Sequence, residues 1–201
     1  MPGEVFVITA PSGTGKTTLL QRLMAGEPRL RFSISYTTRP PRPGEVDGRD
    51  YFFVSPQEFA RLREEGALAE WVEQFGYAYG TSRRRVEETL AAGRDVVFDI
   101  ETRGARALKQ VFPQGTYIFI LPPSWEQLER RLQMRGQMDD SERHRRLEQG
   151  RREVQEVPWY DYLVINDDLN TAVAQLQAIV TASRCRTTRL WPGLAPNFLI
   201  D

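Results

Sequence analysis

The residues best suited to chemistry lie in a glycine-rich segment near the start of the chain, Ala-Pro-Ser-Gly-Thr-Gly-Lys-Thr. Gly13 and Gly15 let successive backbone N–H groups turn toward an anion. Lys16 can reach the β- and γ-phosphates of a nucleoside triphosphate, and the Thr17 hydroxyl can ligate Mg²⁺. The strict P-loop pattern has a glycine where this chain has Ala10. The residues expected to bind ATP are Ala10, Pro11, Ser12, Gly13, Thr14, Gly15, Lys16, Thr17 and Thr18.

A P-loop needs a strand before it and a helix after it, and the flanking residues supply both. Val5–Ile8 is a short apolar run typical of a buried strand, and the leucines from Leu19 to Met24 have helical spacing. Further apolar runs predict strands at 96–100, 117–121 and 163–165, and helices are expected over 124–135 and 169–183. Strands alternating with helices indicate an α/β fold, a parallel sheet flanked by helices.

Composition excludes several classes of protein. The 27 basic and 27 acidic residues cancel, so no basic field points to nucleic acid. Cys185 is the single cysteine, which excludes an intramolecular disulfide framework. The N-terminus has no basic segment typical of a signal peptide, and no apolar stretch approaches the roughly 20 residues of a membrane span. We expect a cytoplasmic protein without a membrane or nucleic-acid partner.

Two segments interrupt the alternation of strands and helices. Residues 33–80 are rich in Pro, Gly, Tyr and Arg and are expected between the first two strands of the sheet. An insertion of that length is either a small subdomain or a long functional loop. Residues 136–158 are densely charged. Most of these charges fit a solvated helical face, but an arginine-bearing lid that closes over phosphates is the sharper hypothesis.

The insertion carries a specific family resemblance. Ser33–Ser55, with its Tyr-Thr-Thr-Arg-Pro-Pro-Arg-Pro-Gly stretch, strongly resembles the guanylate kinase signature. The match continues through Glu70-Trp71, Tyr77–Thr81, Asp99-Ile100 and Asn166–Asp168. The resemblance covers most of the chain and implies a kinase that transfers the γ-phosphoryl group of ATP to GMP, and to dGMP as well.

The resemblance also implies a division of the chain into functional parts. The expected core comprises residues 1–32, 81–135 and 159–185, with a GMP-binding subdomain at 33–80. The lid is expected at 136–158 and an apolar C-terminal tail at 186–201, which either packs on its own domain or contacts a second subunit. The protein is expected to act as a monomer or a homodimer.

The chemistry of the inserted residues fits a nucleoside monophosphate. Arg39 and Arg42 can converge on one phosphate as two guanidinium groups. Guanine presents adjacent N–H donors that one carboxylate can accept, and Glu70 is the candidate. Adenine would leave that carboxylate without paired donors, which favours GMP over AMP. The residues that the resemblance assigns to GMP are Ser35, Arg39, Arg42, Tyr51, Glu70, Tyr79 and Thr81.

The resemblance further implies which residues stabilise the transferring phosphoryl group. Beside Lys16 and Arg39, these are Arg131, Arg135 and Arg146; Arg135 also flanks adenine, and Asn166 lies near the adenine side. Mg²⁺ accompanies ATP as the expected cofactor. Asp99, which ends a predicted strand, suits either a water-mediated contact to Mg²⁺ or a contact on the guanine side.

One short segment departs from the family pattern. Where the family has Asp-x-Asp-x-Gln-Gly, this chain has Asp99-Ile100-Glu101-Thr102-Arg103-Gly104. Glu101 keeps the negative charge of a GMP-binding position but extends it by one methylene, which predicts a shifted contact. Arg103 puts a cation where the family has an amide.

Two other functions fit the sequence less well than the kinase. A binding module on the same fold typically loses P-loop residues, whereas this chain keeps Gly15, Lys16 and Thr17. A related kinase for another phosphorylated acceptor, such as a phosphosugar, should lack the set of Arg39, Arg42, Tyr51 and Glu70. The sequence therefore favours ATP and GMP as small-molecule substrates.

Overall fold

The buried apolar runs form one parallel sheet in the computed structural model, which describes residues 2–74, 76–134 and 139–198. Its strand order is β2-β7-β1-β8-β9. The strands are β1 (Val5–Thr9), β2 (Leu30–Phe32), β7 (Asp95–Asp99), β8 (Thr116–Leu121) and β9 (Tyr162–Ile165). Strand β2 corrects the prediction that residues 33–80 separate the first two strands, because β2 precedes that insertion. Three residues are too few to show a periodicity.

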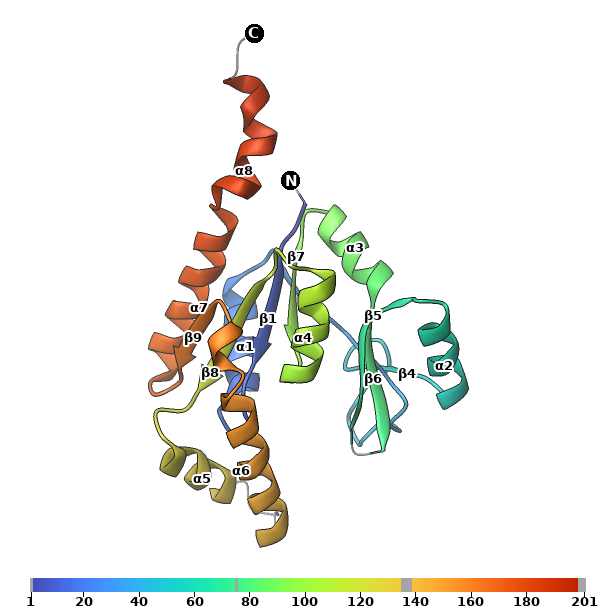
Figure 1. Cartoon of the computed structure of the whole chain (residues 1–201), viewed down its shortest axis with the longest axis vertical. Coiled ribbons are helices and arrows are strands. Elements are labelled where there is room, and N and C mark those ends of the chain that lie inside the picture. Colours follow the sequence, from blue (N-terminus) through green and yellow to red (C-terminus); the bar gives the residue numbers. More distant parts are fainter. Residues whose placement is uncertain (1, 75, 135–138, 199–201) are drawn as a thin grey trace.

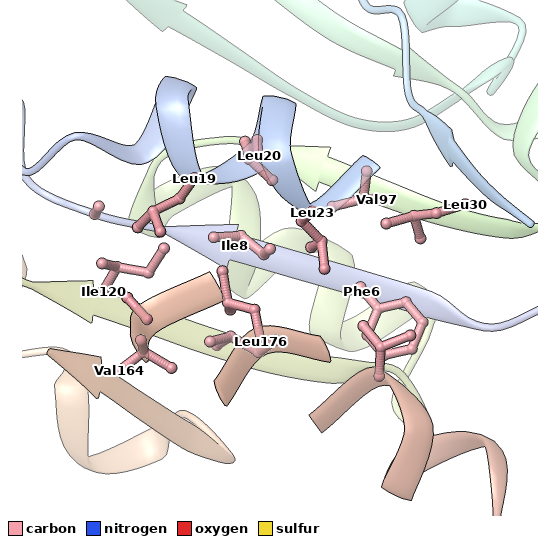
Figure 2. Packing of buried hydrophobic residues seen from close by; sticks show 14 residues of the cluster. Phe6, Ile8, Leu19, Leu20, Leu23, Leu30, Val97, Ile120, Val164 and Leu176 are labelled. Carbon is pink, nitrogen blue, oxygen red and sulfur yellow. The ribbon is translucent and has the colours of Figure 1, made fainter. Parts of the chain in front are cut away.

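Helices cover both faces of this sheet (Figure 1). Helices α1 (Lys16–Gly26) and α7 (Leu169–Arg184) contact each other, and their leucines pack on Phe6 and Ile8 of the central strand (Figure 2). On the opposite face, α3 (Arg83–Ala91) and α4 (Thr102–Val111) cover the alternate residues Val5 and Val7. Because side chains alternate along a strand, an unbroken apolar run is buried on both faces.

The insertion folds as a second, four-stranded sheet with the order β4-β3-β6-β5. Its strands are β3 (Tyr36–Thr37), β4 (Phe52–Phe53), β5 (Leu68–Gln74) and β6 (Tyr77–Ser82). The long pair β5 and β6 is antiparallel, and helix α2 (Pro56–Glu64) contacts β5. The alternative of a long loop is therefore wrong: this segment has a sheet of its own.

The remaining elements lie at the two ends of the parallel sheet. Helices α5 (Trp125–Met134) and α6 (Asp140–Val154) lie together at the end that carries the P-loop, followed by a short 3₁₀ turn at Val157–Trp159 (Figure 1). Helix α8 (Thr187–Leu194) and a 3₁₀ turn at Ala195–Asn197 extend away from the opposite end.

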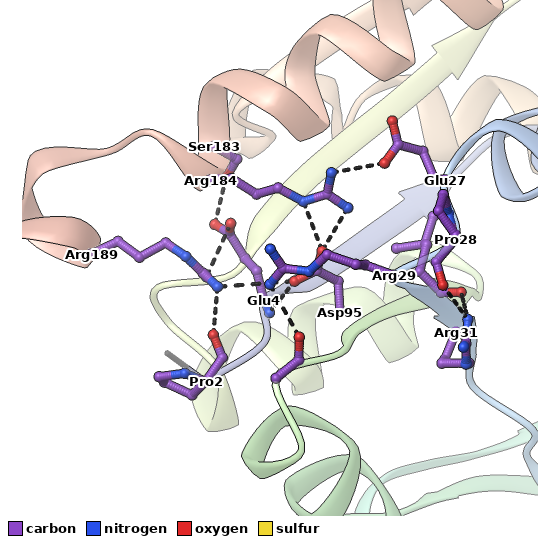
Figure 3. Close-up of polar contacts among 12 residues, drawn as sticks. Pro2, Glu4, Glu27, Pro28, Arg29, Arg31, Asp95, Ser183, Arg184 and Arg189 are labelled. Carbon is purple, nitrogen blue, oxygen red and sulfur yellow. Dashed lines mark hydrogen bonds and ion pairs between the residues drawn. The ribbon is translucent and has the colours of Figure 1, made fainter. Parts of the chain in front are cut away.

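A buried polar cluster joins that opposite end to the C-terminal helices (Figure 3). The backbone N–H of Glu4 donates to Asp95 at 2.8 Å, and Arg184 donates to the second Asp95 oxygen, also at 2.8 Å. Arg189 forms an ion pair with Glu4 at 3.2 Å, and the Ser183 hydroxyl donates to the same Glu4 carboxylate. These bonds fasten α7 and α8 to Glu4, which directly precedes β1, and to Asp95, the first residue of β7.

Candidate active site

The segment between β1 and α1 has the backbone of an anion-binding loop. Gly13 and Gly15 adopt φ values of +94° and +92°, a region that side-chain-bearing residues rarely enter. A Cβ on Gly15 would also lie 2.7 Å from the Asn166 Nδ2 atom. Gly15 precedes the first residue of α1, so free N–H groups of the helix point into the loop.

Lys16 and Asp99 meet because their strands are neighbours. In the parallel register of β1 and β7, Ile8 lies opposite Asp99, which places both strand ends beside the P-loop. The Lys16 ammonium forms an ion pair with the Asp99 carboxylate. Asp99 therefore contacts the lysine that is expected to bind the triphosphate.

Arg131 and Asn166 support the P-loop from behind. The Asn166 side-chain amide donates to the Thr14 carbonyl at 2.7 Å, and Arg131 donates to the same carbonyl at 3.1 Å. Arg131 also donates to the Asn166 carbonyl at 3.0 Å. Asn166 is buried. Both side chains thus hold the loop backbone.

Arg146 connects helix α6 to the P-loop. Its guanidinium donates to the Ser12 hydroxyl at 2.9 Å and to Glu142, one turn earlier on the helix, at 2.7 Å. Arg146, the arginine predicted to lie in the lid, is therefore hydrogen-bonded to the P-loop.

The other residues predicted to bind ATP are placed as follows. Arg135 lies outside the described residues. Thr17 and Thr18 are exposed at the start of α1, while Ala10 and Pro11 are buried.

A cavity of about 350 Å³ lies between the four-stranded sheet and the P-loop end of the parallel sheet. We call it the Glu70 cavity. Its lining joins residues of both sheets: Lys16, Ser35, Arg42, Tyr51, Glu70, Val72, Gln74, Tyr79, Asp99, Ile100, Glu101 and Gly104. Most of the residues predicted to bind GMP are thereby brought together, although they are scattered over the sequence.

Glu70 is the most buried acid of this cavity, with 6% of its surface exposed. It lies on β5, and the Thr81 hydroxyl on the paired strand β6 donates to its Oε1 atom at 2.7 Å. Burial raises the pKa of Glu70 to about 7, which the Thr81 hydrogen bond opposes. Such a carboxylate gains most from a ligand that brings N–H donors. Thr81 lies behind Glu70 and outside the cavity lining.

The two arginines of the predicted phosphate clamp have different environments. Arg39 is 7% exposed and forms an ion pair with Glu45 at 2.8 Å. The second Glu45 oxygen accepts the backbone N–H of Arg42 at 2.7 Å. Arg42 lines the Glu70 cavity, whereas Arg39 lies outside its lining. The sequence did not predict the role of Glu45, because the order of residues in the loop does not show that the chain turns back and brings Glu45 to Arg39.

Tyr51 and Tyr79 form an aromatic wall next to Arg39. Their rings meet edge to face with centroids 6.1 Å apart, and the Arg39 guanidinium lies 5.4 Å from the centre of the Tyr51 ring. Burial raises the pKa of Tyr51, so its hydroxyl remains a donor. Both tyrosines line the Glu70 cavity.

Glu101 contacts side chains that sequence reasoning did not single out. Gln74 at the end of β5 and Gln149 on α6 both donate to its Oε1 atom, at 2.5 and 3.4 Å. Gln149 also donates to Glu153 at 2.9 Å. Burial raises the pKa of Glu153 to about 7, against the effect of the Gln149 bond. Amides carry no charge or motif, so only the three-dimensional structure reveals this set.

The acidic groups do not form a metal-binding cluster of their own. Within residues 2–74, 76–134 and 139–198, no group of three or more His, Cys, Asp or Glu side chains is arranged to hold a metal ion. A magnesium ion bound mainly by phosphates and water needs only one or two protein ligands. Thr17, an exposed residue at the start of α1, and Asp99, which forms an ion pair with the adjacent Lys16, fit that requirement.

Comparisons with known proteins agree with this geometry. A family model described as guanylate kinase matches residues 3–183. The chain is 47% identical to the guanylate kinase of Geobacter sulfurreducens over 199 residues, covering 99% of this chain and 98% of the relative. It is 49% identical to that of Oleidesulfovibrio alaskensis, covering 99% and 96%. The crystal structure of guanylate kinase from Anaplasma phagocytophilum matches with a TM-score of 0.77 and 31% identity, covering 100% and 97%.

A P-loop at the end of a parallel sheet, with a subdomain inserted beside it, defines the class of nucleoside monophosphate kinases. Within that class, the chain belongs to the guanylate kinase family. It converts ATP and GMP into ADP and GDP. In the part of the chain that the structure describes, no helix is long and apolar enough to cross a membrane.

Proposed function

We propose that ATP binds at the P-loop and that GMP binds in the Glu70 cavity. The two glycines with positive φ and the free N–H groups of α1 support the first assignment. The second assignment rests on one observation: the Glu70 carboxylate is buried in a cavity whose lining also contains Lys16. The acid proposed to recognise the base and the lysine proposed to bind the triphosphate therefore line the same cavity.

Glu70 recognises guanine through the N1–H and N2–H₂ donors. Both donors satisfy a carboxylate that otherwise has the Thr81 hydroxyl as its partner. AMP offers no such pair of donors, and burying a carboxylate without them is costly. Ser35 at the cavity wall complements the acceptor side of the base. We expect dGMP to bind as well, since these contacts concern the base.

Arg42, Tyr51 and Tyr79 hold the phosphate of GMP at the wall that faces Lys16. Charge-assisted hydrogen bonds from a guanidinium suit a dianionic phosphate. Arg39 lies outside the cavity lining and forms an ion pair with Glu45. Its positive charge attracts the GMP phosphate as well as Glu45. Together these groups orient one GMP oxygen toward the γ-phosphorus of ATP.

Mg²⁺ binds with ATP, and the Thr17 hydroxyl is its proposed protein ligand, with Asp99 reaching it through water. Asp99 forms an ion pair with Lys16, which places its carboxylate beside the proposed triphosphate site. When bound, the ion neutralises phosphate charge.

Phosphoryl transfer requires positioning rather than a strong base, because the GMP phosphate is already largely deprotonated. The new bond forms between a GMP oxygen and the γ-phosphorus, while the bond to the bridging oxygen of ATP breaks and ADP leaves. Lys16 and Arg146 stabilise the charge on the transferring group. The hydrogen bond from Arg146 to Ser12 supports this role, and Arg131 holds the loop backbone at the Thr14 carbonyl. Arg135 is proposed by resemblance alone.

We propose that the enzyme closes when its substrates bind. In this closure, the GMP-binding subdomain (33–80) and a lid built on α6 move toward the core. The lid excludes water, which would otherwise hydrolyse ATP. The connection of α6 to the P-loop through Arg146 supports this assignment.

The test of the base assignment is Glu70→Gln. The amide places an N–H donor against a guanine donor, so GMP kcat/KM should fall by about 10²-fold or more. The KM for ATP should hardly change. IMP lacks the N2 amino group, so its efficiency should fall less than that of GMP.

Glu73→Gln is the matched control, because Glu73 lies on the same strand but is exposed. It should leave GMP kcat/KM unchanged. A Glu70→Gln enzyme with wild-type efficiency on GMP, or with equal losses on GMP and IMP, would contradict the assignment.

A further inference from the structure

Gly104 lies in the first turn of helix α4 and lines the Glu70 cavity. Glycine destabilises a helix relative to alanine, because it loses more conformational freedom on folding. A glycine is favoured where φ is positive, as at Gly13 and Gly15, but Gly104 does not have a positive φ. The backbone of α4 would therefore accept alanine at this position, which directs attention to the space beside Gly104.

That space adjoins Glu70. A Cβ at position 104 would lie 3.2 Å from the Glu70 Oε2 atom and 3.3 Å from the Ile100 Cδ1 atom. Both distances are shorter than most contacts that a Cβ makes in proteins. Because α4 packs on β5, which carries Glu70, a methyl group at position 104 would displace the carboxylate or separate the helix from the strand.

The two oxygens of the Glu70 carboxylate have different surroundings. Oε1 accepts the Thr81 hydroxyl at 2.7 Å. Oε2 accepts no hydrogen bond within residues 2–74, 76–134 and 139–198, and it is the atom that a Cβ at position 104 would approach most closely. The carboxylate is therefore oriented from one side by the Thr81 donor, and on the other side Gly104 leaves it room.

We propose that Gly104 is a positioning residue for guanine recognition, whose missing side chain keeps the Glu70 Oε2 atom accessible to an N–H donor of the base. The inference rests on the proposed GMP site. Guanine pairs with one carboxylate through two parallel hydrogen bonds, which weaken steeply when donor and acceptor are misaligned. A methyl group beside Oε2 would shift the carboxylate by a few tenths of an ångström and shield that oxygen from the base.

Gly104→Ala tests the role of this space. GMP kcat/KM should fall by about fivefold or more, because a small displacement of the carboxylate impairs a directional pair of hydrogen bonds. The KM for ATP should stay close to that of the wild type, since the substitution concerns the GMP side of the site. Steady-state kinetics with each substrate varied in turn measures both effects.

A double-mutant cycle with Glu70→Gln separates this role from a general effect on packing. In the Glu70→Gln enzyme no carboxylate pairs with the base, so adding Gly104→Ala should lower GMP kcat/KM by less than about twofold. A packing defect alone would cause the same fold-loss in both backgrounds, because the effects of independent changes add as free energies. The cycle thus reports whether Gly104 acts through Glu70.

Two further variants complete the comparison. Gly26→Ala makes the same change at the exposed end of α1, where a Cβ would meet the end of the Gln177 side chain, and it should keep the GMP kcat/KM of the wild type. Combining Ile100→Val with Gly104→Ala removes the Cδ1 contact and leaves the contact with Glu70. This pair should reproduce the loss, relative to Ile100→Val alone, even if Gly104→Ala does not fold.

Wild-type GMP kcat/KM in Gly104→Ala would overturn the proposal, as would equal fold-losses in the two backgrounds of the cycle. The proposal would also be overturned if Gly104→Ala had no effect in the Ile100→Val background. Glu70→Gln without any loss would contradict the base assignment itself, and this inference with it. A loss in Glu70→Gln with none in Gly104→Ala would contradict the role of Gly104 alone.

Discussion

At the scale of single residues, carboxylates hold two cations of the site in place. Lys16 forms an ion pair with Asp99, and Arg39 forms an ion pair with Glu45. Each cation is kept near its expected phosphate by a carboxylate. A preorganised cation costs less to orient when the substrate arrives.

Lys16→Ala should reduce kcat by about 10²-fold or more, because a charge that stabilises the transferring group is worth several kcal/mol. Binding of GMP, measured by calorimetry without ATP, should stay close to that of the wild type. Turnover within about tenfold of the wild type would show that Lys16 does not stabilise the transition state.

The environments of Arg39 and Arg42 predict different defects. Arg42→Ala should raise the KM for GMP, since it removes charge-assisted bonds worth ~1.5–3 kcal/mol, and leave the melting temperature unchanged. Arg39→Ala should raise the same KM and also lower the melting temperature, because it leaves Glu45 without its partner. Steady-state kinetics and thermal unfolding distinguish the two. Equal losses of stability in both variants would contradict this distinction.

The sequence predicted the P-loop residues from their spacing, and the scattered residues of the Glu70 cavity from the family resemblance. The P-loop is a contiguous motif, so Gly13, Gly15 and Lys16 could be assigned from spacing. Glu45 and Gln149 could not be assigned in this way. The partner of Glu45 lies across its loop, and Gln149 contacts Glu101, which lies 48 residues earlier in the chain. Pair formation between distant segments depends on the fold and leaves no pattern in the sequence.

At the scale of elements, helix α6 carries an acid in an unfavourable environment. Glu153 is buried at the C-terminal part of the helix, and its pKa is raised to about 7. A carboxyl whose folded pKa exceeds its unfolded value stabilises the protein at low pH, and that contribution is lost as the pH rises through the folded pKa.

Glu153→Gln should therefore raise the free energy of unfolding relative to the wild type at pH 8, by ~1–3 kcal/mol, and much less at pH 5. Urea unfolding at the two pH values measures this difference. Glu148→Gln, at an acid paired with Arg151 on the same helix, should show little change with pH. A pH-independent effect of Glu153→Gln would mean that the folded carboxyl titrates normally.

The predicted elements were those with enough residues to show a pattern. The four apolar runs became β1, β7, β8 and β9, and the helical segments after 124 and 169 became α5 and α7. Strands of two or three residues, such as β2 and β3, have too few positions for an alternation. The extended conformation of these short strands is instead stabilised by pairing with longer neighbouring strands.

At the scale of the whole molecule, two bodies flank the Glu70 cavity, and substrates should bring them together. Small-angle scattering should give a smaller radius of gyration with a bisubstrate analogue than without ligand. An ATP analogue alone should produce a smaller change, since it leaves the GMP side empty. An unchanged scattering profile at saturating bisubstrate analogue would contradict closure.

The cluster around Glu4 and Asp95 has a consequence for how the chain is made. Protein synthesis proceeds from the N-terminus, so β1 and β7 leave the ribosome well before Arg184 and Arg189. Until those cations emerge, moving the two carboxylates out of water is costly. This end of the sheet should therefore close last during translation, which makes the final helix a late step of folding in the cell.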